Sequence, residues 1–437
     1  MLLSATASAP ARVPYRPADA HYLTVTGGLP PMVGCLLTIA GRPPDVAELR
    51  AGLAPRIERV TALSRHWPVP FRSAREFEHV GSPQLLHHVR QATVDRLADW
   101  PGLLERLWAQ PLPADRRPPW DLWLVRSPED GSRYALLFRV HHALLDGVAT
   151  TRVVTELLGL RPPDAASPSD SPAPRSARPS AADVSATAAT GAAADVLRGY
   201  RTPLTWPAPD DRPGRAPRFG FARLPLSLLR AAGRPAGATV NDVYLAGWAG
   251  ALRSWQQIRA GSGSAAGSRP EDLPVRMPVS TRHLGPPSPV IGNRVISERV
   301  VLPCAEPDPG RRLRAVARQT ALLRPDHRRI AAQAAYDRLS FPLASWIARR
   351  SLRPQRGVMS ASNVRMSAGP LSFRGAPVLH AVALGPIAPG HHCYSMFTGY
   401  HDTAYLYLAH TDRLPHAERL PALWLRAVHE LHEASCR

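Results

Sequence analysis

The stretch that decides the fold is YALLFRV at Tyr134–Val140, followed at once by HHALLDG at His141–Gly147. The first run is apolar except for Arg139 and predicts a buried β-strand. Gly147 permits a tight turn, and the spacing of apolar residues over Val148–Leu158 predicts a helix. The strand therefore delivers two histidines to a sheet edge, where a cleft can form.

A neutral imidazole at such an edge can take a proton from an alcohol or an amine. The Asp146 carboxylate, four residues beyond His142, is expected to point away from the reaction and to fasten the loop by a salt bridge to an arginine. Two other histidine pairs, His87–His88 and His391–His392, are followed by no Asp-Gly. We expect the first to be structural or exposed and the second to lie in a turn or at the surface.

At 437 residues and 44% hydrophobic composition, the chain suits two lobes of ordinary domain size. Its four cysteines, Cys35, Cys304, Cys393 and Cys436, are far apart and lack metal-like spacing, so we expect free thiols in a reducing cytosol and no zinc site. The N-terminal residues lack a signal-peptide pattern, and no long uncharged apolar run occurs. A cytoplasmic protein without a membrane span is predicted.

The formal net charge is +20 and the isoelectric point about 11.1. The sequence contains no lysine, so all 54 basic residues are arginines, and they are scattered rather than gathered in a stripe with aromatics. The charge therefore does not predict nucleic-acid binding. It suits phosphate-bearing small molecules, and it is compatible with peripheral contact to an anionic membrane or other lipid surface.

The chain is expected to divide into an N-terminal lobe at 1–160, a linker at 161–218 and a C-terminal lobe at 219–437. In the first lobe, Val33–Ile39 and Trp123–Leu124 resemble strands, and Val46–Leu53 resembles a helix that Asp45 and Glu48 would cap. The linker is rich in Pro, Ala and Ser and has few large apolar residues. A second flexible insertion, Ala260–Asp272, is expected to be a surface loop.

In the second lobe, Thr239 and Asp242 form a capping-box variant that opens a helix running through Leu252. Asn241 then lies in the first helical turn, where the helix dipole favours a negative group. A purely capping role for Asn241 and Asp242 stays open. Leu273–Val279 predicts a strand, and the runs Tyr394–Thr398 and Ala404–Leu408 predict a hairpin.

Several further segments accompany HHALLDG in a fixed order. They are RPADAHYL (Arg16–Leu23), PWDLWL (Pro119–Leu124), GATVNDVYLA (Gly237–Ala246), MPVSTR (Met277–Arg282), GNR (Gly292–Arg294), SNV (Ser362–Val364) and Thr411-Asp412. With them the chain resembles the bacterial wax ester synthase/diacylglycerol acyltransferase family. This family shares HHxxxDG with chloramphenicol acetyltransferase and with the condensation domains of peptide synthetases. Arg365-Met366-Ser367 departs from the Pro-Gly that usually follows SNV.

The resemblance implies an α/β (α+β) fold of two chloramphenicol-acetyltransferase-like lobes with a catalytic tunnel between them. Acyl-CoA would enter from one side and a hydroxyl acceptor from the other. His142 would act as general base and return the proton to the departing thiolate, without an acyl-enzyme, metal or redox cofactor. His141 would shape the loop, and Gly147 completes the motif.

The resemblance also suggests residues beyond the motif. The oxyanion and substrate-binding candidates are Asn241, Asp242, Ser280, Thr281, Ser362 and Asn363. Arg282 is the expected partner of Asp146, with Arg276 and Arg294 as alternatives.

Three functions remain in competition. The first is transfer of a long-chain acyl group to diacylglycerol or a fatty alcohol, giving triacylglycerol or wax ester. The second is a specialised-metabolite acyltransferase acting on another alcohol or amine, and the third is an inactive protein that binds lipid or coats a droplet. A Cys393–His392 nucleophile is not favoured, because no residue is available to orient the base.

Overall fold

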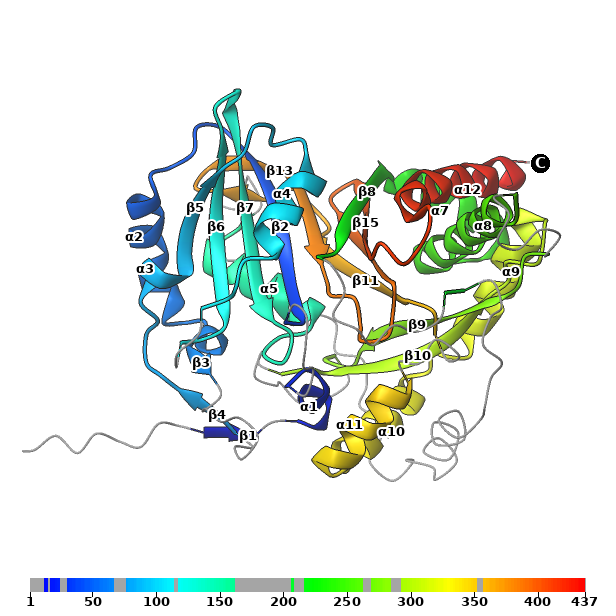
Figure 1. The fold of residues 1–437 in the computed structure, drawn as a ribbon, viewed down its shortest axis with the longest axis horizontal. Helices are drawn as coiled ribbons and strands as arrows, with labels where there is room; N and C mark the ends of the chain where they lie inside the picture. The colour runs from blue at the N-terminus through cyan, green and yellow to red at the C-terminus, as the bar shows by residue number, and fades with distance from the viewer. Residues whose placement is uncertain are drawn as a thin grey trace, which may run out of the picture.

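The computed structural model describes residues 12–14, 16–23, 30–66, 76–113, 117–161, 206–207, 216–261, 269–283, 292–351 and 357–436. Two six-stranded sheets lie side by side, as Figure 1 shows, and each is accompanied by helices. Most of the expected linker 161–218 and of the expected loop Ala260–Asp272 lies outside the described residues.

The first sheet is built around the apolar run that precedes the motif. Its strand order is β12-β13-β2-β7-β6-β5. The strands are β2 (Met32–Ala40), β5 (Val89–Thr93), β6 (Trp120–Ser127), β7 (Asp130–His141), β12 (Ser372–Phe373) and β13 (Ala376–Leu384). The predicted strand Tyr134–Val140 is thus confirmed within β7, which is antiparallel to β2 and β6.

The charge inside the apolar run is compensated by an ion pair. Arg139 is fully buried, and its Nε donates to Asp121 Oδ1 at 2.9 Å. Its Nη1 also donates to the carbonyl oxygens of Leu107 and Gln110. Burial of this guanidinium is tolerated because its donors are satisfied.

The strands β12 and β13 join the first sheet although they come late in the chain. β13 is antiparallel to β2, with Ala381 opposite Leu37. The continuous range 219–437 expected for the second lobe therefore does not correspond to one sheet. This pairing is set by contact between distant apolar segments, and local sequence patterns do not encode it.

The second sheet has the order β10-β9-β11-β14-β15-β8. Its strands are β8 (Arg218–Pro225), β9 (Leu273–Ser280), β10 (Val295–Leu302), β11 (Ser360–Ser367), β14 (Cys393–Tyr400) and β15 (Thr403–His410). The predicted hairpin is confirmed as β14 and β15, with His401 in the left-handed region of its turn at φ 53°. A small sheet contains β1 (Arg12–Pro14), β4 (Glu76–His79) and β3 (Arg65–His66).

The helices pack against these sheets and against one another. They are α1 (Pro17–Leu23), α2 (Val46–Ile57), α3 (Leu85–His88), α4 (Trp100–Trp108), α5 (Gly147–Leu158), α7 (Leu226–Gly233), α8 (Val240–Gly261), α9 (Pro309–Ala321), α10 (Asp326–Asp337), α11 (Phe341–Ser351) and α12 (Leu420–Ser435). Short 3₁₀ turns occur at Thr61–Ser64, Arg234–Ala236 and Ala417–Arg419.

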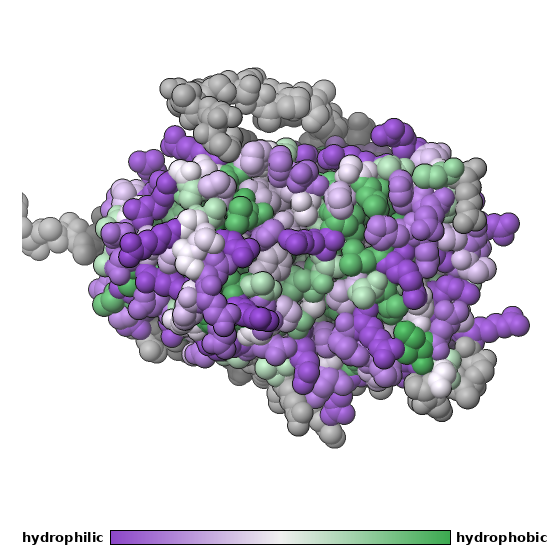
Figure 2. Space-filling model, turned by 90° about the horizontal axis from the view of Figure 1, so that it is seen from above, coloured by the Kyte–Doolittle hydropathy of each residue, from purple (hydrophilic) through white to green (hydrophobic). Residues whose placement is uncertain are grey.

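Two capping predictions are confirmed. Asp45 and Glu48 form the capping box of α2, and Thr239 and Asp242 exchange hydrogen bonds at the start of α8. Hydrophilic residues cover much of the face in Figure 2, with apolar patches between them. Within the described residues, none of the helices has the length and apolar character that crossing a bilayer requires.

Candidate active site

The motif histidines lie where β7 ends, and backbone hydrogen bonds fix them there. His141 N–H donates to Pro119 O at 2.9 Å, and His142 N–H donates to Pro31 O at 2.7 Å. The chain then turns, and Asp146 becomes the N-cap of α5, with its Oδ1 accepting from Ala149 N at 2.8 Å. The strand, turn and helix expected around HHALLDG are all present.

The His142 ring is partly exposed and stacks on Tyr22 of α1, with ring centroids 3.9 Å apart and planes inclined by 10°. Its Nδ1 is enclosed and makes no hydrogen bond of normal geometry within the described residues. Burial lowers the pKa of His142. The carbonyl oxygens of His142 and Leu145, the Asp146 carboxylate and the Asn293 side chain oppose this shift. The imidazole is therefore neutral at pH 7.

His141 has different surroundings. It is buried, its Nδ1 accepts a hydrogen bond from Ala143 N at 3.2 Å, and burial lowers its pKa to about 3. The hydrogen bond places a lone pair, not a proton, on Nδ1 and ties the ring to the turn. This geometry matches the loop-shaping role expected for His141.

Arg282, which follows β9 in the second lobe, lies against Asp146. Its Nε donates to Oδ1 at 3.0 Å and to Oδ2 at 2.9 Å, and both side chains are almost fully buried. Arg294 contributes its backbone N–H to Asp146 Oδ2 at 3.0 Å. Arg276, the other alternative, instead binds Ser297. Asp146 thus joins the motif turn of one lobe to the other lobe and has no free oxygen to offer a substrate.

Sequence reasoning missed two buried residues beside the motif, Asp19 and Asn293. Asn293 N and Nδ2 donate to Asp19 Oδ1 at 2.7 and 2.8 Å, and Nδ2 also donates to His142 O at 2.8 Å. Burial raises the pKa of Asp19 to about 6, against the hydrogen bonds from Asn293 and Arg16. These contacts tie α1 and the GNR segment to the backbone of His142. The signal was present, because both residues lie in segments that carry the family resemblance.

The two candidates at the start of α8 separate in the structure. Asp242 is fully buried and accepts from Thr320 Oγ1 at 2.5 Å and Arg324 Nη2 at 2.6 Å, besides its capping bond. These contacts agree with the capping alternative for Asp242, and not with a role in binding substrate. Asn241 is less buried, and its Oδ1 accepts from Asn363 Nδ2 at 3.0 Å.

The remaining candidates do not converge on one point. Thr281 Oγ1 donates to Gln333 at 2.7 Å, and Ser280 Oγ accepts from Arg282 N at 3.4 Å. On β11 alternate residues face opposite sides, so Ser362 shares a face with Val364, whereas Asn363 points to α8. A Cβ added at Gly147 would lie 3.1 Å from Val364 Cγ2. Ser362 therefore faces the motif side, and Asn363 does not.

The other histidine pairs do not form sites. His88 is buried, its Nδ1 donates a hydrogen bond to Trp120 O at 2.8 Å, and its ring stacks on the Trp120 ring. His391 and His392 are also buried, so the surface alternative for them is wrong, whereas the turn alternative is confirmed by the hydrogen bond from His391 N to Ala388 O at 3.0 Å. Their segment precedes β14, which is enclosed along its whole length. Burial raises the pKa of the Cys393 thiol, which disfavours a thiolate nucleophile there.

Comparisons with known proteins agree with this geometry. Residues 19–206 match the Wax ester synthase/diacylglycerol acyltransferase catalytic domain, and residues 291–432 match the WS/DGAT C-terminal domain. A putative diacylglycerol O-acyltransferase of Mycobacterium bovis is 28% identical over 397 residues, covering 82% of this chain and 81% of that protein. A probable diacylglycerol O-acyltransferase of Mycobacterium tuberculosis matches to the same extent.

Among solved structures, the wax ester synthase/diacylglycerol acyltransferase from Marinobacter aquaeolei VT8 superposes with a TM-score of 0.66 at 22% identity, covering 97% of this chain and 100% of that one. The first condensation domain of the calcium-dependent antibiotic synthetase gives a TM-score of 0.60 at 18% identity, with 98% of each chain covered. The expected two-lobe fold is confirmed. With its two family domains and its HHALLDG turn, the chain belongs to the wax ester synthase/diacylglycerol acyltransferase family and is an acyltransferase.

Proposed function

We propose that this protein transfers a long-chain acyl group from acyl-CoA to the hydroxyl of diacylglycerol or a fatty alcohol, with His142 as general base. The observation that carries the proposal is the environment of His142. The Nδ1 of the ring is enclosed by protein, and the backbone acceptors that interact with the imidazole are the carbonyl oxygens of His142 and Leu145. They favour the tautomer with the proton on Nδ1, which leaves the Nε2 lone pair for the substrate.

In the proposed reaction, Nε2 takes the hydroxyl proton as the acceptor oxygen attacks the thioester carbonyl. A new C–O bond forms, and the tetrahedral oxyanion collapses with cleavage of the C–S bond. The imidazolium then returns its proton to the departing thiolate. Tyr22 holds the ring plane by stacking, and Asn293 holds the His142 carbonyl. Tyr22 and Asn293 would act as positioning residues, because they hold the imidazole in the orientation that proton transfer requires.

Ser362 is the oxyanion donor that the geometry favours among the candidates. It faces the motif side of β11, whereas the hydroxyl of Thr281 is committed to Gln333. Tyr394 lies beside Ser362 and interacts with its side chain. The proposal needs no metal and no covalent intermediate, and it leaves acyl-CoA as a substrate and not a cofactor.

A cytoplasmic protein that acts on lipids must reach a lipid surface, and α11 supplies a face for peripheral contact. Leu343 and Trp346, three residues apart on α11, are 45% and 47% exposed. Arg349 and Arg350 occupy the last turn of the helix, with Arg350 over the Trp346 ring. Apolar side chains beside arginines suit an anionic interface. A Leu343→Ser/Trp346→Ser variant should lose co-sedimentation with phosphatidylglycerol vesicles.

The activity is tested with purified protein, palmitoyl-CoA and either dioleoylglycerol or hexadecanol, with products identified by mass spectrometry. We expect triacylglycerol or wax ester together with one equivalent of free CoA. Formation of no ester with either acceptor, in protein that is folded by circular dichroism, would overturn the proposal. An amide or ester formed only with a polar alcohol or amine would favour the specialised-metabolite alternative instead.

A further inference from the structure

A cavity of 690 Å³ lies outside the motif, beside α5. Val148, Thr151 and Thr155 line it at helical spacing, and the end of α2 and β11 complete its walls. Its volume is within the range of small-molecule sites. His142 is not among its lining residues.

The cavity is strongly basic. Five arginines and one glutamate line it, namely Arg56, Arg59, Arg152, Arg161, Arg365 and Glu156. Arg56 is held at the C-terminus of α5, where its Nη1 donates to Leu158 O at 2.6 Å. The other four arginines are exposed.

In the described part of the chain, no carboxylate forms an ion pair with any of these five arginines. Like charges gathered at one concave surface raise the local potential and attract an anion. Arginine is suited to phosphate because its planar fork donates two parallel hydrogen bonds.

The cavity begins next to the catalytic turn. Val148, which lines it, follows Gly147, the last residue of HHALLDG. On the opposite wall, Arg365 follows Val364, the residue that approaches Gly147. From there the cavity follows α5 to Leu160, about 18 Å for a helix of this length. An acyl thioester reacting at His142 could extend its carrier portion along this path.

We propose that the arginine cavity binds the phosphate groups of the acyl donor's nucleotide, and so selects a nucleotide-bearing thioester over a thioester that lacks phosphate. This inference rests on the proposed function. The same chemistry fits the phosphate of an anionic lipid headgroup, and the experiment separates the two sources.

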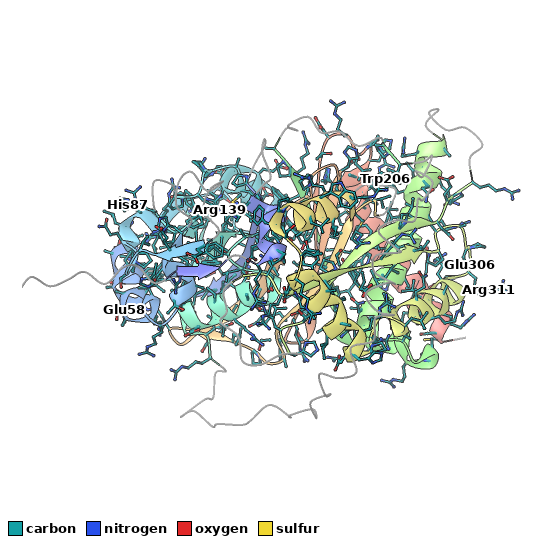
Figure 3. All side chains as sticks on the ribbon, turned by 90° about the horizontal axis from the view of Figure 1, so that it is seen from below. Glu58, His87, Arg139, Trp206, Glu306 and Arg311 are labelled. Carbon is teal, nitrogen blue, oxygen red and sulfur yellow. The ribbon has the colours of Figure 1, made fainter. Side chains whose placement is uncertain are left out.

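The test compares Arg152→Glu and Arg365→Glu with the control Arg311→Glu, which makes the same charge change at an exposed position of α9. Figure 3 shows Arg311 at the opposite end of the molecule from Glu58, the neighbour of Arg59. KM is measured for palmitoyl-CoA and for the palmitoyl thioester of N-acetylcysteamine, which has no phosphate. Adenosine 3′,5′-bisphosphate binding is measured by calorimetry, and phosphatidylglycerol vesicle binding by flotation.

We expect each cavity variant to raise KM for palmitoyl-CoA at least about tenfold and to weaken adenosine bisphosphate binding to match, as for loss of one charged hydrogen bond. KM for the N-acetylcysteamine thioester should not change in the cavity variants, and KM for palmitoyl-CoA should not change in the Arg311→Glu control. Unchanged bisphosphate binding with loss of vesicle flotation would overturn the proposal in favour of a lipid headgroup. Equal rises in KM for both donors would also overturn it.

The two proposals fail separately. If the wild-type protein released thiol from neither donor, the proposed function would fail, while adenosine bisphosphate binding would still decide the role of the cavity. If transfer proceeded and the cavity variants behaved like Arg311→Glu, the cavity proposal alone would fail.

Discussion

The ion pair between Asp146 and Arg282 joins the two lobes at the catalytic turn, and its removal is the most informative perturbation. The Arg282→Ala variant leaves the Asp146 carboxylate buried, with Ala149 N and Arg294 N as its remaining partners. Both side chains of the pair are under 5% exposed. Loss of one partner from a buried pair costs about 3 to 5 kcal/mol of unfolding free energy.

The assay is urea unfolding followed by circular dichroism, in a double-mutant cycle with Asp146→Asn. We expect a coupling energy of about 1 to 3 kcal/mol between the two substitutions, as for directly bonded residues. Arg276→Ala is the matched control, since Arg276 is a buried arginine of β9 that binds Ser297 instead. It should destabilise the protein without coupling to Asp146→Asn. Additive effects of Arg282→Ala and Asp146→Asn would refute the assignment of this pair.

Three further outcomes are expected. Burial lowers the pKa of His142. The acid limb of the pH profile of kcat/KM should therefore lie below pH 6.5, with activity lost only as the pH falls through that lowered pKa. An acid limb at or above pH 6.5 would contradict the role of His142 as a neutral base. Asn293→Ala removes the donor to His142 O, and it should lower kcat with little change in KM for palmitoyl-CoA; an unchanged kcat would exclude positioning by Asn293. Asp242→Ala should lower the free energy of unfolding by about 1 to 2 kcal/mol, as for loss of a helix cap, and should leave the kcat of the folded protein unchanged. A loss of kcat without a loss of stability would assign Asp242 to the active site.

Local patterns sufficed for the elements nearest the site. An apolar run ending in HHALLDG predicted the strand and helix around the turn, and the Asp45–Glu48 spacing predicted the capping box of α2. Such features depend on residues close in sequence, where hydrophobic period and capping chemistry act directly. Length and composition also predicted two lobes, and the resemblance then gave their chloramphenicol-acetyltransferase-like fold.

Most contacts between residues far apart in the chain could not be predicted from the sequence. The pairing of β13 with β2 and the hydrogen bonds from Asn293 to Asp19 join residues that are hundreds of positions apart. The burial of His391 and His392 has the same cause, because a turn before a strand does not reveal which distant residues will cover it. The ion pair of Asp146 is an exception, because the resemblance led us to expect Arg282 as its partner, and the side chain of Arg282 does bind it, whereas Arg276 binds Ser297 and Arg294 contributes only its backbone N–H.

The central claim is that His142 is the base of an acyl transfer to a hydroxyl group. The most direct test measures CoA release from palmitoyl-CoA, with and without dioleoylglycerol or hexadecanol, for the wild-type protein, His142→Ala and the control His87→Ala from the pair without Asp-Gly. The account predicts acceptor-dependent release that falls about 10²- to 10⁴-fold in His142→Ala and persists in His87→Ala. Acceptor-dependent release that is unchanged in His142→Ala would contradict it.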